Sequence, residues 1–386
     1  MQKTNDKTDN IIAVVLALIV YIPATSTGNL IRLGVVIVAF VMKHMNESPE
    51  PEIRKIGLYM LLSPMISVFF VFIIEGFGLN WEIILHEIQR MVFCSLLLMT
   101  VVKMQISFRM IYCISILVLI PNFIIQLLQQ AQVESVFTFI RNHYESNVSS
   151  EEWTHLDLAR EEGEGFRAGS IFINPNVYMA IPLMALVVFL HQDRERSSIW
   201  NYGLIGCSAY SCFLTGSRTA TVVLAIIMLW YIIKYARTLS RVFLIIAIFY
   251  VGYTYGSYLL TTRAAKIFEA DSFEVKLNSF KWFFASTSQT FIYWITGAIG
   301  SRIASYYFDG EIGYIYGWYG IFGVYWYIQY YKYIWKNNAN LSFYTKPIFV
   351  VHLFVAVTAS VLLCMPTYSY VSVIAFSRFY YRNRET

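Results

Sequence analysis

Apolar runs long enough to cross a lipid bilayer follow one another along almost the whole chain, separated by polar turns. A helix needs roughly 17–25 mostly apolar residues to cross about 30 Å of hydrocarbon. The candidate spans are residues 11–25, 28–42, 56–74, 83–102, 110–129, 173–190, 199–215, 218–233, 242–260, 311–331, 347–364 and 366–381. The pattern predicts an all-α membrane protein, a bundle of about twelve transmembrane helices in one domain, residues 1–386.

The distribution of Lys and Arg predicts the orientation of this bundle. Positive residues collect on the cytoplasmic segments of membrane proteins. If the N-terminus is cytoplasmic, most of the 29 Lys and Arg residues fall on inner segments, and the short outer turns 23–27, 75–82 and 215–217 contain none. Both termini are then cytoplasmic, and two long outer loops remain, 130–172 and 261–310. Residues 261–290 mix aromatic and basic residues, as amphipathic interfacial helices do.

Composition excludes a soluble protein and several classes of function. Hydrophobic residues make up 57% of the chain and charged residues 14%, against about 25% charged residues in an ordinary soluble domain. The net charge of +5 is spread over the loops, which argues against nucleic-acid binding. The His and Cys residues have no ligand spacing, and the chain lacks Walker, GxGxxG and GxSxG motifs. We therefore expect no metal and no cofactor.

The first candidate site is FRAGSIFINPNVYM, residues 166–179, where an apolar run begins. Asn174 can cap a helix that starts at Pro175, because Asn is a frequent N-cap and Pro suits the first helical turn. Arg167 precedes this helix start. Two interpretations stay open: an arginine at the lipid headgroups beside a capped helix, or an anion site in which Arg167 and the helix N-terminus bind a phosphate.

The second candidate is the tight turn LTGSRTATVV, residues 214–223, between two predicted spans. Arg218 lies at or just inside the outer membrane boundary. An arginine there is costly unless it is paired or faces water, so it either extends to lipid phosphate or belongs to a functional site. Arg32 and Arg90 also lie toward the outer ends of their spans, and Glu87 is spaced to pair with Arg90 at i,i+3.

The third candidate is the stretch 296–323, in which Arg302 is followed by two acids and several glycines. Asp309 and Glu311 are either solvated loop acids or general bases. Glycines three and four residues apart let helices pack closely. Close packing is the favoured explanation of Gly313, Gly317, Gly320 and Gly323.

Together these stretches resemble the Wzy-type oligosaccharide repeat-unit polymerases of the O-antigen ligase and polymerase superfamily. The family shows an Arg-containing pattern before a span, a short Ser-Arg turn between the next spans, and a glycine-rich stretch with an acid and an aromatic-Gly pair. The matching residues are Arg167, Gly169, Phe172, Asn174, Pro175, Asn176, Ser217, Arg218, Gly297, Gly300, Asp309, Tyr319 and Gly320. Arg302 and Gly313 also fit an Arg-x10-Gly spacing. The resemblance covers roughly residues 160–325.

The resemblance implies a glycosyltransferase of the plasma (inner) membrane. Its substrates would be undecaprenyl-diphosphate-linked oligosaccharide repeat units, which it would polymerise into O-antigen, capsular or exopolysaccharide at the outer face. Arginines would hold the leaving diphosphate, and an acid, Asp309 first and Glu311 second, would be the base. The implied catalytic residues are Arg167, Arg218, Arg302, Asp309 and Glu311, and the implied substrate-binding residues are Asn174, Asn176 and Lys281. Membrane lipid, a chain-length regulator and a flippase are further candidate partners.

Departures from the family pattern and rival functions are both visible. O-antigen ligases have a His near the position of Asp309, and its absence here favours a polymerase. Relatives often have an Arg before a Trp in the second outer loop, where this chain has Lys281-Trp282, so either Lys281 or Arg302 takes that role. The alternatives are a ligase, or a lipid-linked oligosaccharide flippase or other transporter. Transporters usually show internal repeats and midplane polar helices, whereas this chain concentrates its polar residues at the outer edge.

Overall fold

The computed structural model describes residues 2–23, 25–45, 48–144, 168–172, 175–195, 198–235, 271–303, 311–337, 342–358 and 364–380. Four helices of this part of the chain are long and apolar enough to cross a membrane. They are α2 (Ser26–His44), α3 (Pro51–Glu75) continued by η2 (Gly76–Gly78), α4 (Trp81–Val102) and α5 (Phe108–Gln130). The chain is thus an all-α membrane protein, as its hydrophobic pattern predicts. The number of spans and the side on which the termini lie stay predictions.

The remaining elements complete the fold. They are α1 (Gln2–Leu18), η1 (Ile19–Tyr21), β1 (Gln105–Ser107), α6 (Glu134–Tyr144), α8 (Pro175–Tyr178), α9 (Ala180–Glu195), α10 (Ile199–Leu214), α11 (Arg218–Tyr235), α13 (Asp271–Ser286), α14 (Ile292–Thr296), α15 (Glu311–Asn337), α16 (Ser342–Thr358), α17 (Met365–Phe376) and β2 (Arg378–Tyr380). Every predicted span coincides with one or two helices except 242–260, which lies outside the described residues. The predicted span 366–381 is wrong at its end, because α17 stops at Phe376 and a strand follows.

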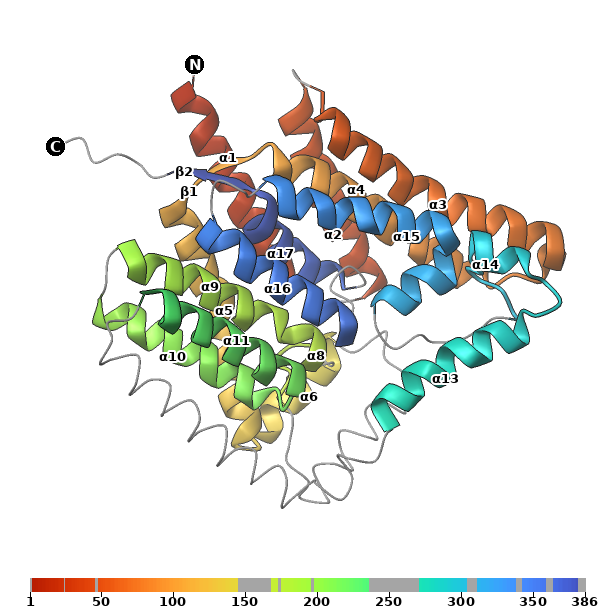
Figure 1. The fold of residues 1–386 in the computed structure, drawn as a ribbon. Coiled ribbons are helices and arrows are strands. Elements are labelled where there is room, and N and C mark those ends of the chain that lie inside the picture. The colour runs from red at the N-terminus through yellow and green to blue at the C-terminus, as the bar shows by residue number, and fades with distance from the viewer. Residues whose placement is uncertain are drawn as a thin grey trace.

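Two groups of helices are joined by the C-terminal helices α16 and α17 (Figure 1). In the first group α4 packs against α2, α3 and α17, and in the second α9 packs against α5, α10 and α16. Because α17 contacts both α4 and α9, the last part of the chain connects the two groups. Their apolar side chains form one core, in which Phe93, Phe189 and Trp326 are fully buried.

The two ends of the described chain lie at the same end of the bundle (Figure 1). Strand β2 pairs in parallel with β1, with Gln105 opposite Arg378. Asp9 of α1 accepts hydrogen bonds from the Gln105 backbone NH at 2.9 Å and from Lys43 Nζ at 2.6 Å. The short β1–β2 pair has no counterpart in the sequence prediction.

Helix α15 is broken at Gly320, whose backbone has φ 60° and ψ −151°. This left-handed φ suits glycine because a Cβ is disfavoured there. A Cβ on Gly320 would also lie 2.1 Å from the Ile295 carbonyl oxygen, and one on Gly297 would lie 2.2 Å from the Trp318 carbonyl oxygen. The segment after α14 therefore packs directly against the break. Close packing at Gly320 is confirmed, and two helical pieces meet inside the predicted span 311–331.

Candidate functional site

The first two sequence candidates lie side by side. The Ala168 backbone NH donates to the Leu214 carbonyl oxygen at 2.9 Å, which joins the segment after Arg167 to the turn before Arg218. Gln126 of α5 holds both segments, since its Nε2 donates to the Ala168 carbonyl at 2.9 Å and to the Ser211 carbonyl at 3.3 Å. Two motifs that lie far apart in the sequence thus share one location.

Buried polar residues of α5 fix this location, and sequence reasoning missed them. Gln129 and Ser170 exchange two hydrogen bonds at 2.9 Å, from Gln129 Nε2 to the Ser170 carbonyl and from the Ser170 NH to Gln129 Oε1. Ser170 Oγ donates to Asn122 Oδ1 at 2.6 Å. Asn122, Gln126 and Gln129 follow a spacing of four and three residues, which puts them on one helix face. That spacing inside an apolar run was the available signal.

The helix starts of both motifs agree with the sequence, although most of their functional side chains lie outside the described residues. Helix α8 begins at Pro175, as predicted, and Asn176 is half-buried in it. Helix α11 begins at Arg218, where the Ala220 NH approaches Ser217 Oγ at 3.4 Å. Arg167 and Asn174 themselves lie outside the described residues, as does the Arg218 side chain.

The third candidate, around Arg302, is held by hydrogen bonds to the turn between α3 and α4. Glu75 at the end of α3 accepts hydrogen bonds from the Ser301 hydroxyl, from the Arg302 backbone NH at 2.9 Å and from the Tyr293 hydroxyl at 2.8 Å. Burial and the neighbouring Glu75 carboxylate raise the pKa of Tyr293, so this phenol stays a donor. The Asn80 NH donates to the Gly300 carbonyl at 2.9 Å. Three hydrogen bonds to Glu75 and one backbone hydrogen bond from Asn80 thus hold this loop in place.

Arg302 is exposed and lines an open pocket of about 330 Å³. The other lining residues are Leu79, Asn80, Trp81, Ile83 and Ser301. A cation, an amide and an indole around one pocket are groups that bind phosphate and sugar, since Arg pairs with phosphate oxygens and Trp stacks on apolar ring faces. Arg302 is thus a candidate cation whose side chain lies on a pocket of the described structure.

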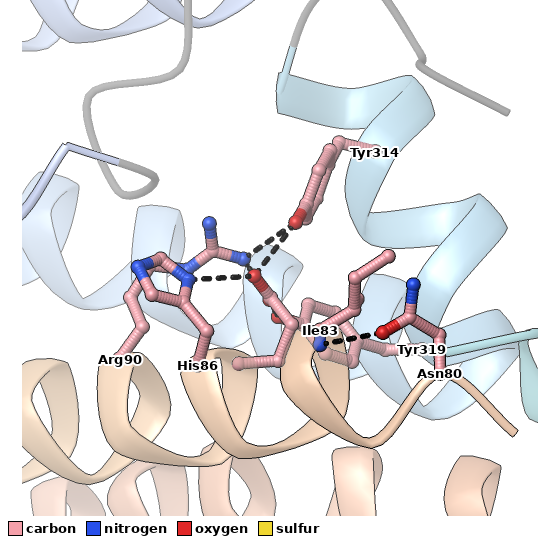
Figure 2. A network of polar contacts seen from close by, with 7 residues as sticks. Asn80, Ile83, His86, Arg90, Tyr314 and Tyr319 are labelled. Atoms are coloured by element: carbon pink, nitrogen blue, oxygen red, sulfur yellow. Dashed lines mark hydrogen bonds and ion pairs between the residues drawn. The ribbon is translucent and has the colours of Figure 1, made fainter. Parts of the chain in front are cut away.

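A buried ion pair holds the first piece of α15 against α4 (Figure 2). Arg90 and Glu87 form the i,i+3 pair that their spacing predicts. The hydroxyls of Tyr314 and Tyr319 donate to Glu87 at 2.8 and 2.6 Å, and Arg90 Nη2 lies 3.0 and 3.1 Å from the same hydroxyls. Glu87 and Arg90 are 2% and 3% exposed. The sequence predicted the ion pair but not the two tyrosines. Together these residues hold the helix piece that begins at Glu311.

Glu311 is buried, with 1% of its surface exposed, and lies next to the Tyr327 hydroxyl. The interpretation of Glu311 as a solvated loop acid is therefore wrong, because the break in α15 folds its N-terminal end into the protein. Asp309 lies outside the described residues. Lys281 is exposed on α13, a helix that packs against α15. Within the predicted amphipathic segment 261–290, residues 271–286 are helical, as expected.

Comparison with known protein families and with curated proteins found no match to this chain. In the described residues no group of His, Cys, Asp and Glu side chains is arranged to hold a metal ion.

Proposed function

We propose that the chain is a membrane glycosyltransferase that polymerises undecaprenyl-diphosphate-linked oligosaccharide repeat units at the outer face of the plasma membrane. One observation carries the proposal: the hydrogen bond from Ala168 to Leu214 brings together two of the three stretches on which the family resemblance rests. This contact between segments that adjoin the two arginines supports a single substrate site for both. The pocket of Arg302 adds a further cation on an ordered loop.

The proposed reaction needs a leaving group held by cations and a base. A hydroxyl oxygen of the acceptor unit forms a bond to the anomeric carbon of the donor, the bond from that carbon to the diphosphate oxygen breaks, and the hydroxyl proton passes to the base. Arginine suits the diphosphate because its planar fork pairs with two phosphate oxygens and stays charged. In a site that excludes water, such donors stabilise the negative charge that develops on the leaving diphosphate more strongly than they would in water.

The residues take the following roles in this proposal. Arg167, Arg218 and Arg302 bind the diphosphate, and Lys281 is an alternative to Arg302. Asp309 or Glu311 takes the proton, and Asn174 and Asn176 bind the oligosaccharide. No metal is needed in this scheme, because the arginines balance the diphosphate charge.

Deletion of the gene tests the proposal in cells. We expect gel electrophoresis of surface polysaccharide to show single repeat units on the final acceptor in place of a ladder, because units are still exported but no longer joined. Complementation with the wild-type chain should restore the ladder. If the deletion instead leaves lipid-linked units unexported on the inner face, the chain is a flippase, and if long polymer accumulates on the lipid carrier, it is a ligase.

A further inference from the structure

Two arginines in the described part of the chain are buried, and they differ in how their charge is balanced. Arg90 is paired with the carboxylate of Glu87. Arg32, in the second turn of α2, is 1% exposed, yet none of the described carboxylates forms an ion pair with it. The half-buried Lys43 also has an acid, Asp9, at 2.6 Å. Of these three cations, Arg32 is therefore the one that has no carboxylate partner among the described residues.

The contacts of Arg32 are neutral. Its two terminal nitrogens donate to Asn29 Oδ1 and to the carbonyl oxygen of Ile22, and its Nε has no hydrogen-bond partner. Cys364 and Tyr144, two further uncharged groups, are also near it. A carbonyl at a helix end offers only a partial negative charge. A buried guanidinium with neutral partners and an unpaired NH is expected to be balanced by an anion from outside these residues.

Hydrogen bonds link the first candidate segment to Tyr21, the residue that precedes Ile22, the carbonyl partner of Arg32. Ser170 Oγ donates to Asn122 Oδ1 at 2.6 Å, and Asn122 Nδ2 donates to the Tyr21 hydroxyl at 3.3 Å. The Tyr144 hydroxyl donates to the Tyr21 carbonyl at 3.0 Å, next to Ile22, the partner of Arg32. The segment that follows Arg167 and the surroundings of Arg32 thus belong to one end of the bundle.

We propose that Arg32 binds a phosphate group of a membrane lipid at this end of the bundle. The ligand is either the diphosphate of the lipid-linked substrate, in which case the inference rests on the proposed function, or the phosphate of an anionic phospholipid. Arg32 was not one of the cations assigned to the reaction. A buried guanidinium with an unpaired Nε–H, in the second turn of an apolar helix, matches a phosphate joined to a lipid tail.

Thermal unfolding of the purified full-length chain in nanodiscs tests this proposal. One arm uses neutral phosphatidylcholine with and without inorganic pyrophosphate, and a second arm uses phosphatidylglycerol. We expect at least one anion to raise the melting temperature of the wild type, because a ligand that binds the folded state stabilises it. A response to pyrophosphate identifies the diphosphate, and a response to phosphatidylglycerol alone identifies the phospholipid headgroup.

Arg32→Met should weaken the response, with an apparent dissociation constant about tenfold higher or more, as expected for lost charge-assisted hydrogen bonds. Without anion its melting temperature should stay close to that of the wild type, because removal of an unbalanced buried charge offsets the loss of the hydrogen bonds to Asn29 and Ile22. Arg32→Lys should keep part of the response. Arg109→Met, which removes an exposed arginine at the start of α5, should respond like the wild type.

Two results would overturn the proposal: a full response of Arg32→Met, or no response of the wild type in either arm. These readouts need no polymer, so they are independent of the deletion experiment. A loss of pyrophosphate binding in Arg32→Met would stand even if the chain proved not to be a polymerase.

Discussion

Replacement of Arg218 by alanine is expected to abolish the polysaccharide ladder in the deletion strain while single units are still exported. The backbone of Arg218 begins α11, beside the segment that follows Arg167. Removal of one preorganised donor from a developing negative charge commonly lowers the rate by about 10²–10³-fold. The measurement is electrophoresis of surface polysaccharide from strains complemented with each variant, at protein levels matched by immunoblot.

Controls separate a loss of chemistry from a loss of protein. Arg109→Ala removes an exposed arginine at the opposite end of α5 from Gln126 and Gln129, and it should leave the ladder unchanged. Arg218→Lys keeps the charge without the fork and should give a shorter ladder. A normal ladder from Arg218→Ala at equal protein level would remove Arg218 from the site.

Replacement of Arg90 by methionine is expected to cause the largest loss of stability. The substitution leaves the buried Glu87 carboxylate without its cation, and loss of one partner of a buried ion pair costs about 3–5 kcal/mol. The double variant Glu87→Gln/Arg90→Met removes the stranded charge and should recover part of that loss. The measurement is the free energy of unfolding from denaturant titration of the purified protein in micelles.

An exposed ion pair gives the matched control. Lys336 and Glu52 lie 3.3 Å apart with both side chains mostly exposed, and such pairs contribute little. Lys336→Met should therefore change the free energy of unfolding much less than Arg90→Met. Equal effects of the two substitutions would show that the Glu87 network does not hold α15 against α4.

The positions of the helices could be predicted from the sequence because a long apolar run in lipid must form a helix. A helix pairs its backbone polar groups internally and exposes apolar side chains to the lipid. The break in α15 could not, because its cause is not local. Gly320 reads as one more glycine in an apolar run, and its conformation matters only because the segment around Ile295 and Gly297 packs against it. The burial of Glu311 follows from that break and was missed for the same reason.

Part of the candidate site was also open to prediction. The start of α8 at Pro175 and the pairing of Glu87 with Arg90 are local features, set by capping and by helical spacing. The contact between Ala168 and Leu214 is a tertiary contact, and the role of Glu75 in fastening the Arg302 loop depends on segments more than two hundred residues apart. Hydropathy alone contains no information on such contacts. The β1–β2 pair was missed because three-residue strands show no alternation.

The most direct test of the central claim is polymerisation by the purified protein. The wild-type chain in liposomes is given synthetic undecaprenyl-diphosphate-linked oligosaccharide, and products are separated by length while free lipid diphosphate is measured. We predict a ladder of products, with lipid diphosphate released for every linkage formed, and neither from Arg218→Ala. Unchanged oligosaccharide in the presence of correctly folded wild-type protein, with the lipid-linked units moved across the bilayer, would contradict the proposed function.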